Sequence, residues 1–247
     1  MKIPILYEDN HLLLVEKPIN IPVQADRSGD NDLLTMLKKD LKLRYQKPGN
    51  VYLGLVHRLD RPVGGAMVFA KTSKAASRLS DMIRRHVIER NYLAVVHGTP
   101  NKKRGQLVHY LHKDNQKNKV SVVSSNHPKA KKAVLDYEII ESKKGLSLLS
   151  VNLHTGRPHQ IRVQLSTMGN PIYGDQKYGE SRNKPGQQLA LWAHSLYFDH
   201  PVKKEPIGAY SLPSSIYPWN LWETCKDREG KQTGEDFAIE GLLSYID

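Results

Sequence analysis

The chain has little of what secreted, disulfide-bonded or membrane-spanning proteins need. It holds one cysteine, Cys225, in 247 residues, which excludes an intrachain disulfide and a zinc site of clustered cysteines. No apolar run approaches the roughly 18 residues that cross a bilayer. The first residues turn acidic at Glu8 and Asp9, too early for a secretory signal. These absences predict a cytoplasmic protein with no membrane partner.

Acidic residues are also few relative to basic ones. The chain carries 25 Asp and Glu against 37 Lys and Arg, a formal net charge of +12, which predicts a polyanionic partner. No repeat or clear linker interrupts the sequence, so one domain over residues 1–247 is expected. Trp219 and Trp222 are expected to dock onto this domain rather than to stack on bases, and residues 235–247 hold a short amphipathic run.

Hydrophobic patterns predict an α+β fold. Helices are expected over residues 33–41, 74–88 and 158–169, and strands over residues 5–16, 66–70, 91–98, 107–111, 120–123, 134–141, 146–153 and 189–198. Asp30 or Asn31 would cap the first helix, and Pro158 and Gly169 would begin and end the third. Because strands outnumber helices and do not alternate with them, the sheet should be mixed, mainly antiparallel, with flanking helices.

Two segments concentrate positive charge. The basic side chains on and after the helix at 74–88, up to Arg90, either form a solvated face or contact phosphate. The strands at 107–111 and 120–123 predict a protruding hairpin, and its basic tip around Lys117 suits phosphate contact.

The most unusual stretch places Asp60 between Arg58 and Arg61, just after His57 and before Gly64-Gly65. Flanking cations favour the ionised form of a carboxylate, and the glycine pair is expected to leave space for a ligand. Asp60 is therefore a candidate nucleophile. The competing interpretation is a surface turn with a weak, screened ion pair.

A second stretch, over residues 153–175, predicts a buried partner for that aspartate. Arg162 lies near a helix start, where a cation is unfavourable without a carboxylate. We expect it to pair with an acid, for which Asp60 is a candidate; the alternative is an exposed helix arginine. His154 and His159 form only a weak metal signal, and Asp175 is expected to cap a turn.

Five segments in order resemble the RluA-type pseudouridine synthases, which isomerise uridine in RNA. They are Glu8–Pro18, His57–Gly65, Asn91–Ala94, Thr155–Arg162 and Gly169–Asp175. The resemblance covers residues 5–202 and leaves 203–247 as a C-terminal extension. It implies no separate N-terminal RNA-binding domain. The chain departs from the family at Val63-Gly64-Gly65, where Thr-Ser-Gly is common, and at Trp192, where histidine is frequent.

The resemblance implies a central active-site cleft and roles for particular residues. Asp60 is the essential carboxylate, Tyr92 stacks on the uracil and Arg162 pairs with Asp60. The residues expected to contact the substrate are Arg58, His57, Leu191 and Arg157, with structural support as a second reading for His57. No cofactor or metal is required, because the isomerisation involves no redox change. The implied partner is rRNA or tRNA, and the implied state is a monomer.

Two other functions fit parts of the pattern. A non-catalytic RNA-binding or assembly factor would share the fold and the basic surface, but would not need Asp60, Tyr92 and Arg162 together. A glycosidase with an aspartate nucleophile would need a second carboxylate, and none accompanies Asp60 in its motif.

Overall fold

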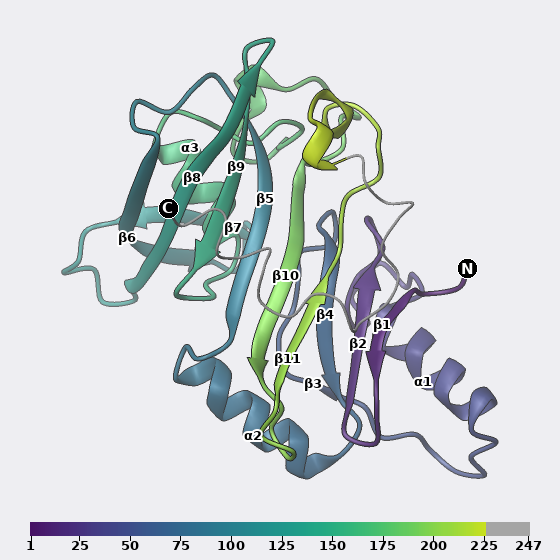
Figure 1. The fold of residues 1–247 in the computed structure, drawn as a ribbon. Coiled ribbons are helices and arrows are strands. Elements are labelled where there is room, and N and C mark those ends of the chain that lie inside the picture. The colour runs from purple at the N-terminus through teal and green to yellow at the C-terminus, as the bar shows by residue number, and fades with distance from the viewer. Residues whose placement is uncertain (226–247) are drawn as a thin grey trace.

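The computed structural model describes residues 1–225, with the element order shown in Figure 1. The strands are β1 (Ile5–Glu8), β2 (Leu12–Lys17), β3 (Gly54–Leu55), β4 (Gly64–Ala70), β5 (Glu89–His97), β6 (Arg104–Asp114), β7 (Lys119–Val123), β8 (Lys131–Lys143), β9 (Leu146–Leu153), β10 (Leu191–Asp199) and β11 (Pro206–Tyr210). The helices are α1 (Leu33–Arg44), α2 (Ser73–Arg84) and α3 (Gln160–Thr167), with short 3-10 turns at Glu180–Arg182, Trp219–Leu221 and Glu223–Cys225.

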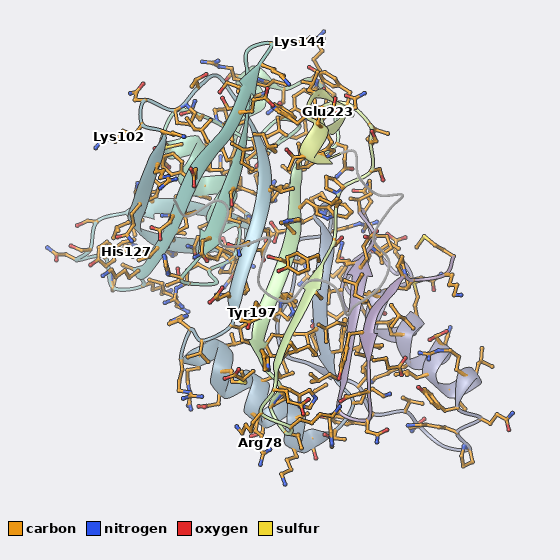
Figure 2. The ribbon with its side chains drawn as sticks, viewed as in Figure 1. Arg78, Lys102, His127, Lys144, Tyr197 and Glu223 are labelled. Carbon is orange, nitrogen blue, oxygen red and sulfur yellow. The ribbon has the colours of Figure 1, made fainter. Side chains whose placement is uncertain are left out.

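The strands of the described residues form one sheet, in the order β1-β2-β4-β10-β5-β9-β8-β6-β7, with β11 on β10 and β3 on β4. The pairs are antiparallel except β4 with β10, which run parallel. The predicted α+β class with a mainly antiparallel sheet is confirmed, and the predicted hairpin is the β6–β7 pair. Figure 2 shows Arg78 at the α2 end of the molecule and Lys102 and His127 at the edge where β6 lies.

Both faces of the sheet are covered around β4, whose residues are all buried. Met67 and Phe69 join the cluster that includes the leucines of α1, whereas Ala66, Val68 and Ala70 join the one that includes α2. Side chains alternate between the two faces along a strand, so neighbouring residues of β4 serve different layers. A strand buried on both faces must be apolar throughout, as this one is.

The helix ends differ from the predictions. The side chain of Asp32, not Asp30 or Asn31, caps α1 by accepting a hydrogen bond from the Thr35 N–H. Helix α2 ends at Arg84 instead of residue 88, because His86 adopts a left-handed φ of 58° and turns the chain into β5. Arg90 consequently lies on that strand rather than following the helix.

The C-terminal part of the described chain packs against the sheet. Trp219 and Trp222 are buried in the main core cluster, so their predicted docking is confirmed. The preceding strand, β11, was not predicted, because residues 206–210 lack a clear alternating pattern. The amphipathic run at 235–247 lies outside the described residues.

The glycine pair opens no space for a ligand, and that expectation was wrong. It allows β4 to approach β10: a Cβ on Gly64 would lie 2.3 Å from a ring carbon of Trp192, and a Cβ on Gly65 would lie 2.1 Å from the Ala193 carbonyl oxygen. Gly65 also has a φ of 115°, which side chains rarely adopt. Trp192 fills the space over Gly64 and donates from Nε1 to the Ser211 hydroxyl at 3.0 Å.

We predict that Gly65→Ala lowers the free energy of unfolding by at least about 3 kcal/mol, because steric overlap and backbone strain add. Gly29→Ala is the control, since Gly29 has a φ of 74° and nothing within 4 Å of an added Cβ. It should cost only about 1–2 kcal/mol. Urea denaturation of both variants measures the difference, and equal losses would show that the approach of the two strands is not the constraint.

Candidate active site

A cleft of about 770 Å³ brings together all seven residues singled out from the sequence. They come from the loop between β3 and β4, from β5, from the loop before α3 and the helix itself, and from the start of β10. In chain order they are His57, Arg58, Asp60, Tyr92, Arg157, Arg162 and Leu191. Segments far apart in the sequence therefore form one site.

The cleft is strongly cationic. Seven arginine or lysine side chains line it against two aspartates, Asp26 and Asp60. Lys113 and Asn118, at the end of the β6–β7 hairpin, also line it, so the predicted basic tip stands at the rim of this cleft. Such a lining attracts an anionic ligand and repels cations.

Arg162 joins two carboxylates inside the protein. Its Nη1 donates to Asp60 Oδ2 at 3.1 Å, the pair that the sequence predicted. Its Nε and Nη2 donate to the two oxygens of Asp175, both at 2.8 Å. Burial would lower the pKa of Arg162, but the hydrogen bonds and charge of Asp175, with the charge of Asp60, raise it above its ordinary value. The guanidinium is thus permanently charged and fixed in orientation.

Asp175 has a larger role than the predicted turn cap. It does accept from the backbone N–H groups of Lys177 and Tyr178. It is also almost fully buried and is the bidentate partner of Arg162. Burial alone would raise the pKa of its carboxyl, but the bonds from Arg162 and the backbone lower it overall. Because it does not line the cleft, it cannot be the second carboxylate of a glycosidase.

The loop before α3 is held by its own side chains. Gln160 accepts from the Thr155 hydroxyl at 2.8 Å and from the Arg157 N–H at 3.0 Å. His159 adopts a left-handed φ of 51°, which delays the helix start to Gln160, two residues beyond Pro158, where the sequence placed it. The helix ends before Gly169, with its φ of 93°, as predicted.

His159 connects the hairpin to Asp60 through Tyr178. The Tyr178 hydroxyl accepts from the Val120 N–H of β7 at 2.9 Å and is hydrogen-bonded to His159 Nδ1 at 2.6 Å. The other ring nitrogen of His159, Nε2, lies 3.9 Å from Asp60 Oδ2. The pKa of His159 is lowered, mainly by burial.

Lys17 anchors the loop that carries Asp60. Its side chain is fully buried, and its Nζ donates to the carbonyl oxygens of Pro18, Arg61 and Val63 at 2.7–3.0 Å. Three donated bonds require the ammonium form. Burial opposes that form and lowers the pKa of Lys17 to about 7, with Asp60 acting in the other direction. Lys17 is not among the residues that the sequence singled out, although its place in the segment Glu8–Pro18 was a signal.

Tyr92 and Leu191 form the apolar part of the cleft. Both are more than nine-tenths buried. Burial raises the pKa of the Tyr92 phenol above its ordinary value, so the group is neutral at pH 7 and a poor base. Tyr92 lines the cleft, a position that the predicted stacking on a base requires.

The other side chains predicted to contact the substrate differ in how strongly the protein already binds them. Arg58 is exposed at the cleft. Arg157 is half-buried and donates from Nε to the Lys132 carbonyl oxygen at 2.9 Å. His57 accepts at Nε2 from the Val68 N–H at 3.1 Å, and burial, then the charge of Arg90, lower its pKa to about 4. A neutral ring with one nitrogen engaged in this way favours the structural reading of His57.

Within residues 1–225, no group of three or more His, Cys, Asp or Glu side chains is placed to hold a metal ion. None of the helices in that range is long and apolar enough to cross a membrane.

Comparison with known proteins assigns the family. A family model described as RNA pseudouridylate synthase matches residues 11–167, well over half of the chain. The chain belongs to the RNA pseudouridylate synthase family. It is therefore an enzyme of the isomerase class, and its relatives named as synthases C and D place it in the RluA-type branch.

Three relatives illustrate the match. The uncharacterized RNA pseudouridine synthase YhcT of Bacillus subtilis is 34% identical over 91% of this chain and 72% of its own length. Ribosomal large subunit pseudouridine synthase D of Zymomonas mobilis is 33% identical over 82% and 67%. Ribosomal large subunit pseudouridine synthase C of Buchnera aphidicola is 36% identical over 82% and 64%.

Solved structures agree on the fold. Human RNA pseudouridylate synthase domain containing 4 superposes with a TM-score of 0.71 at 24% identity, covering 85% of this chain and 89% of its own. Human RNA pseudouridylate synthase domain containing 1 gives 0.66 at 23% identity, covering 88% and 85%. The pseudouridine synthase fold expected from the sequence is confirmed.

We predict that Asp175→Asn lowers kcat for uridine in RNA by about 10²-fold, because Arg162 loses the charged bidentate partner that orients it. RNA affinity should change little, since Asp175 lies outside the cleft. Asp136→Asn is the control, because Asp136 is a half-exposed carboxylate that pairs with His154. Single-turnover kinetics separate the effects, and a change confined to KM would contradict the orienting role.

We predict that His57 makes the fold sensitive to acid. The unfolded chain binds a proton at this histidine near pH 6.5, whereas the folded one stays neutral down to about 4. The contribution of His57 to the free energy of unfolding is therefore fully present above pH 6.5. It is lost as the pH falls toward 4, by up to about 3 kcal/mol.

Urea denaturation at pH 7 and in steps down to about 4 tests this, with His57→Gln in parallel. Glutamine keeps an acceptor for the Val68 N–H but does not titrate in this range. Parallel pH profiles for the two proteins would show that His57 contributes nothing to acid sensitivity.

Proposed function

We propose that this enzyme isomerises specific uridines of rRNA or tRNA to pseudouridine, with Asp60 as the essential carboxylate. The observation that carries the proposal is the Arg162–Asp60 pair: a carboxylate held by a buried guanidinium in a cleft whose lining is mainly cationic. A non-catalytic binding factor has no need to keep an anion in a site that attracts RNA, because Asp60 repels phosphate.

The reaction breaks the bond between uracil N1 and ribose C1′, turns the base and joins C5 to C1′. The C5 proton leaves and N1 ends protonated, so atoms and charge balance without a co-reactant. Asp60, hydrogen-bonded to Arg162, acts on the ribose or on the base. Tyr92 stacks on the flipped uracil and Leu191 closes the apolar wall of its pocket. Arg58 takes the place that the nucleotide vacates.

Recognition of the RNA rests on the cationic rim. Arg157 and Lys113 line the cleft on the side of α3 and the hairpin. Tyr178 joins the hairpin to the loop before α3 by bonding Val120 and His159, and His159 lies near Asp60, so RNA on the hairpin would also lie close to Asp60. Phosphate contacts of this kind position a substrate without reading its sequence. Relatives named for the large ribosomal subunit make its RNA the first pool to test.

We predict that Asp60→Asn lowers turnover at least about 10³-fold while RNA binding stays within a few-fold. The measurement is tritium release from RNA labelled at uracil C5, taken from cells that lack this protein. Total RNA and purified large-subunit rRNA serve as separate substrates.

Asp26→Asn is the matched control, because Asp26 is the other carboxylate of the cleft. It should retain activity, whereas its inactivation would favour a two-carboxylate mechanism. Undiminished tritium release by Asp60→Asn would overturn the proposed chemistry. RNA binding with no release by the wild-type protein would favour a binding factor.

A further inference from the structure

Arg90 is a buried cation without a matching anion. Its side chain is 7% exposed and lines the cleft from β5. Among residues 1–225 it forms no ion pair, and its one hydrogen bond runs from Nη2 to the Leu153 carbonyl oxygen at 3.4 Å. Its Nε is buried with no partner in that range. Because a buried unpaired charge is strongly unfavourable, we expect a ligand to complete its contacts.

The wall around Arg90 is cationic too. Arg157 lines the same cleft, as does Arg84, which pairs with Asp81, and neither aspartate of the cleft pairs with Arg90. Burial, followed by the charges of Arg90 and Arg157, lowers the pKa of His86. A group that binds at this wall should therefore be an anion rather than a neutral carbonyl.

The structure keeps space for the guanidinium. A Cβ on Gly156 would lie 2.8 Å from Arg90 Nη1, and Gly156 has no left-handed φ that would call for glycine. Glycine at position 156 therefore leaves the space that the Arg90 guanidinium occupies. Arg90 lies on β5 and Gly156 lies on the loop before α3, so their positions in the sequence did not predict that they would be close.

Arg90 also lies at a suitable place relative to the base. It is two residues before Tyr92 on β5, so both side chains leave the same face of the strand, about 7 Å apart. That spacing is comparable to the separation of a nucleobase from its flanking phosphates. A nucleotide whose base stacks on Tyr92 would bring one phosphate near Arg90.

We propose that Arg90 is the anion subsite of the cleft and binds the RNA phosphodiester that flanks the nucleotide held at Asp60 and Tyr92. The subsite rests on the proposed function for the identity of its ligand. Binding a phosphate would neutralise the guanidinium and supply acceptors for its free N–H groups, with bidentate geometry.

The test compares uridine 3′,5′-bisphosphate with uridine as ligands, by isothermal titration calorimetry. Wild-type protein should bind the bisphosphate at least about tenfold more tightly. Arg90→Met should remove most of that preference and leave uridine affinity unchanged, and Arg90→Lys should restore part of it. Lys102→Gln is the control, because Lys102 lies outside the cleft at the edge shown in Figure 2.

Two further readouts separate binding from folding. Arg90→Met should have a Tm at least equal to that of the wild type, because it removes an unpaired buried charge. Gly156→Ala keeps every charge but displaces Nη1, so it should weaken bisphosphate binding several-fold without changing uridine binding.

Three outcomes would overturn the proposal. One is bisphosphate binding no tighter than uridine in the wild type, including no binding of either at millimolar concentration. Another is a preference that survives Arg90→Met, and the third is an equal loss for both ligands, which would assign Arg90 to the base. None of these measurements needs turnover, so they stand even if Asp60→Asn keeps its activity.

Discussion

The site depends on one buried guanidinium. Arg162 binds Asp175 with two hydrogen bonds and Asp60 with a third, and Asp60 lies 102 residues earlier in the chain. Removing either carboxylate would leave a buried charge undercompensated, which is costly. The requirement therefore holds α3, the loop after Gly169 and the loop before β4 in one arrangement.

The cleft combines opposite electrostatic demands. The proposed RNA substrate needs a positive lining, yet the proposed chemistry needs a carboxylate at its centre. Arg162 balances Asp60 locally, so the cleft keeps an excess of cationic side chains. Lys17 anchors the loop that carries Asp60 by donating to three backbone carbonyl oxygens. His159 lies near Asp60 on the side of the hairpin. The carboxylate is thus positioned by groups from three directions.

Close approach of two strands completes the site. The parallel contact of Gly64 and Gly65 with β10 places the loop of Asp60 next to Leu191. The glycines are needed because Trp192 and the backbone at Ala193 occupy the space that side chains would take. The positions of Leu191 and of the loop that carries Asp60 are therefore set by the packing of β4 against β10.

The sequence by itself determined the fold class, the strand pairs joined by short turns, the charge of the surface and the Arg162–Asp60 pair. Periodicity, capping residues and the unfavourable place of a cation at a helix start are local signals, and motif order supplied the rest. Only the tertiary structure decided that Asp175 holds Arg162, that the glycine pair admits β10, and that Arg90 is buried without an anion. Those facts depend on which distant segments share a volume, and no local pattern encodes the distance between them.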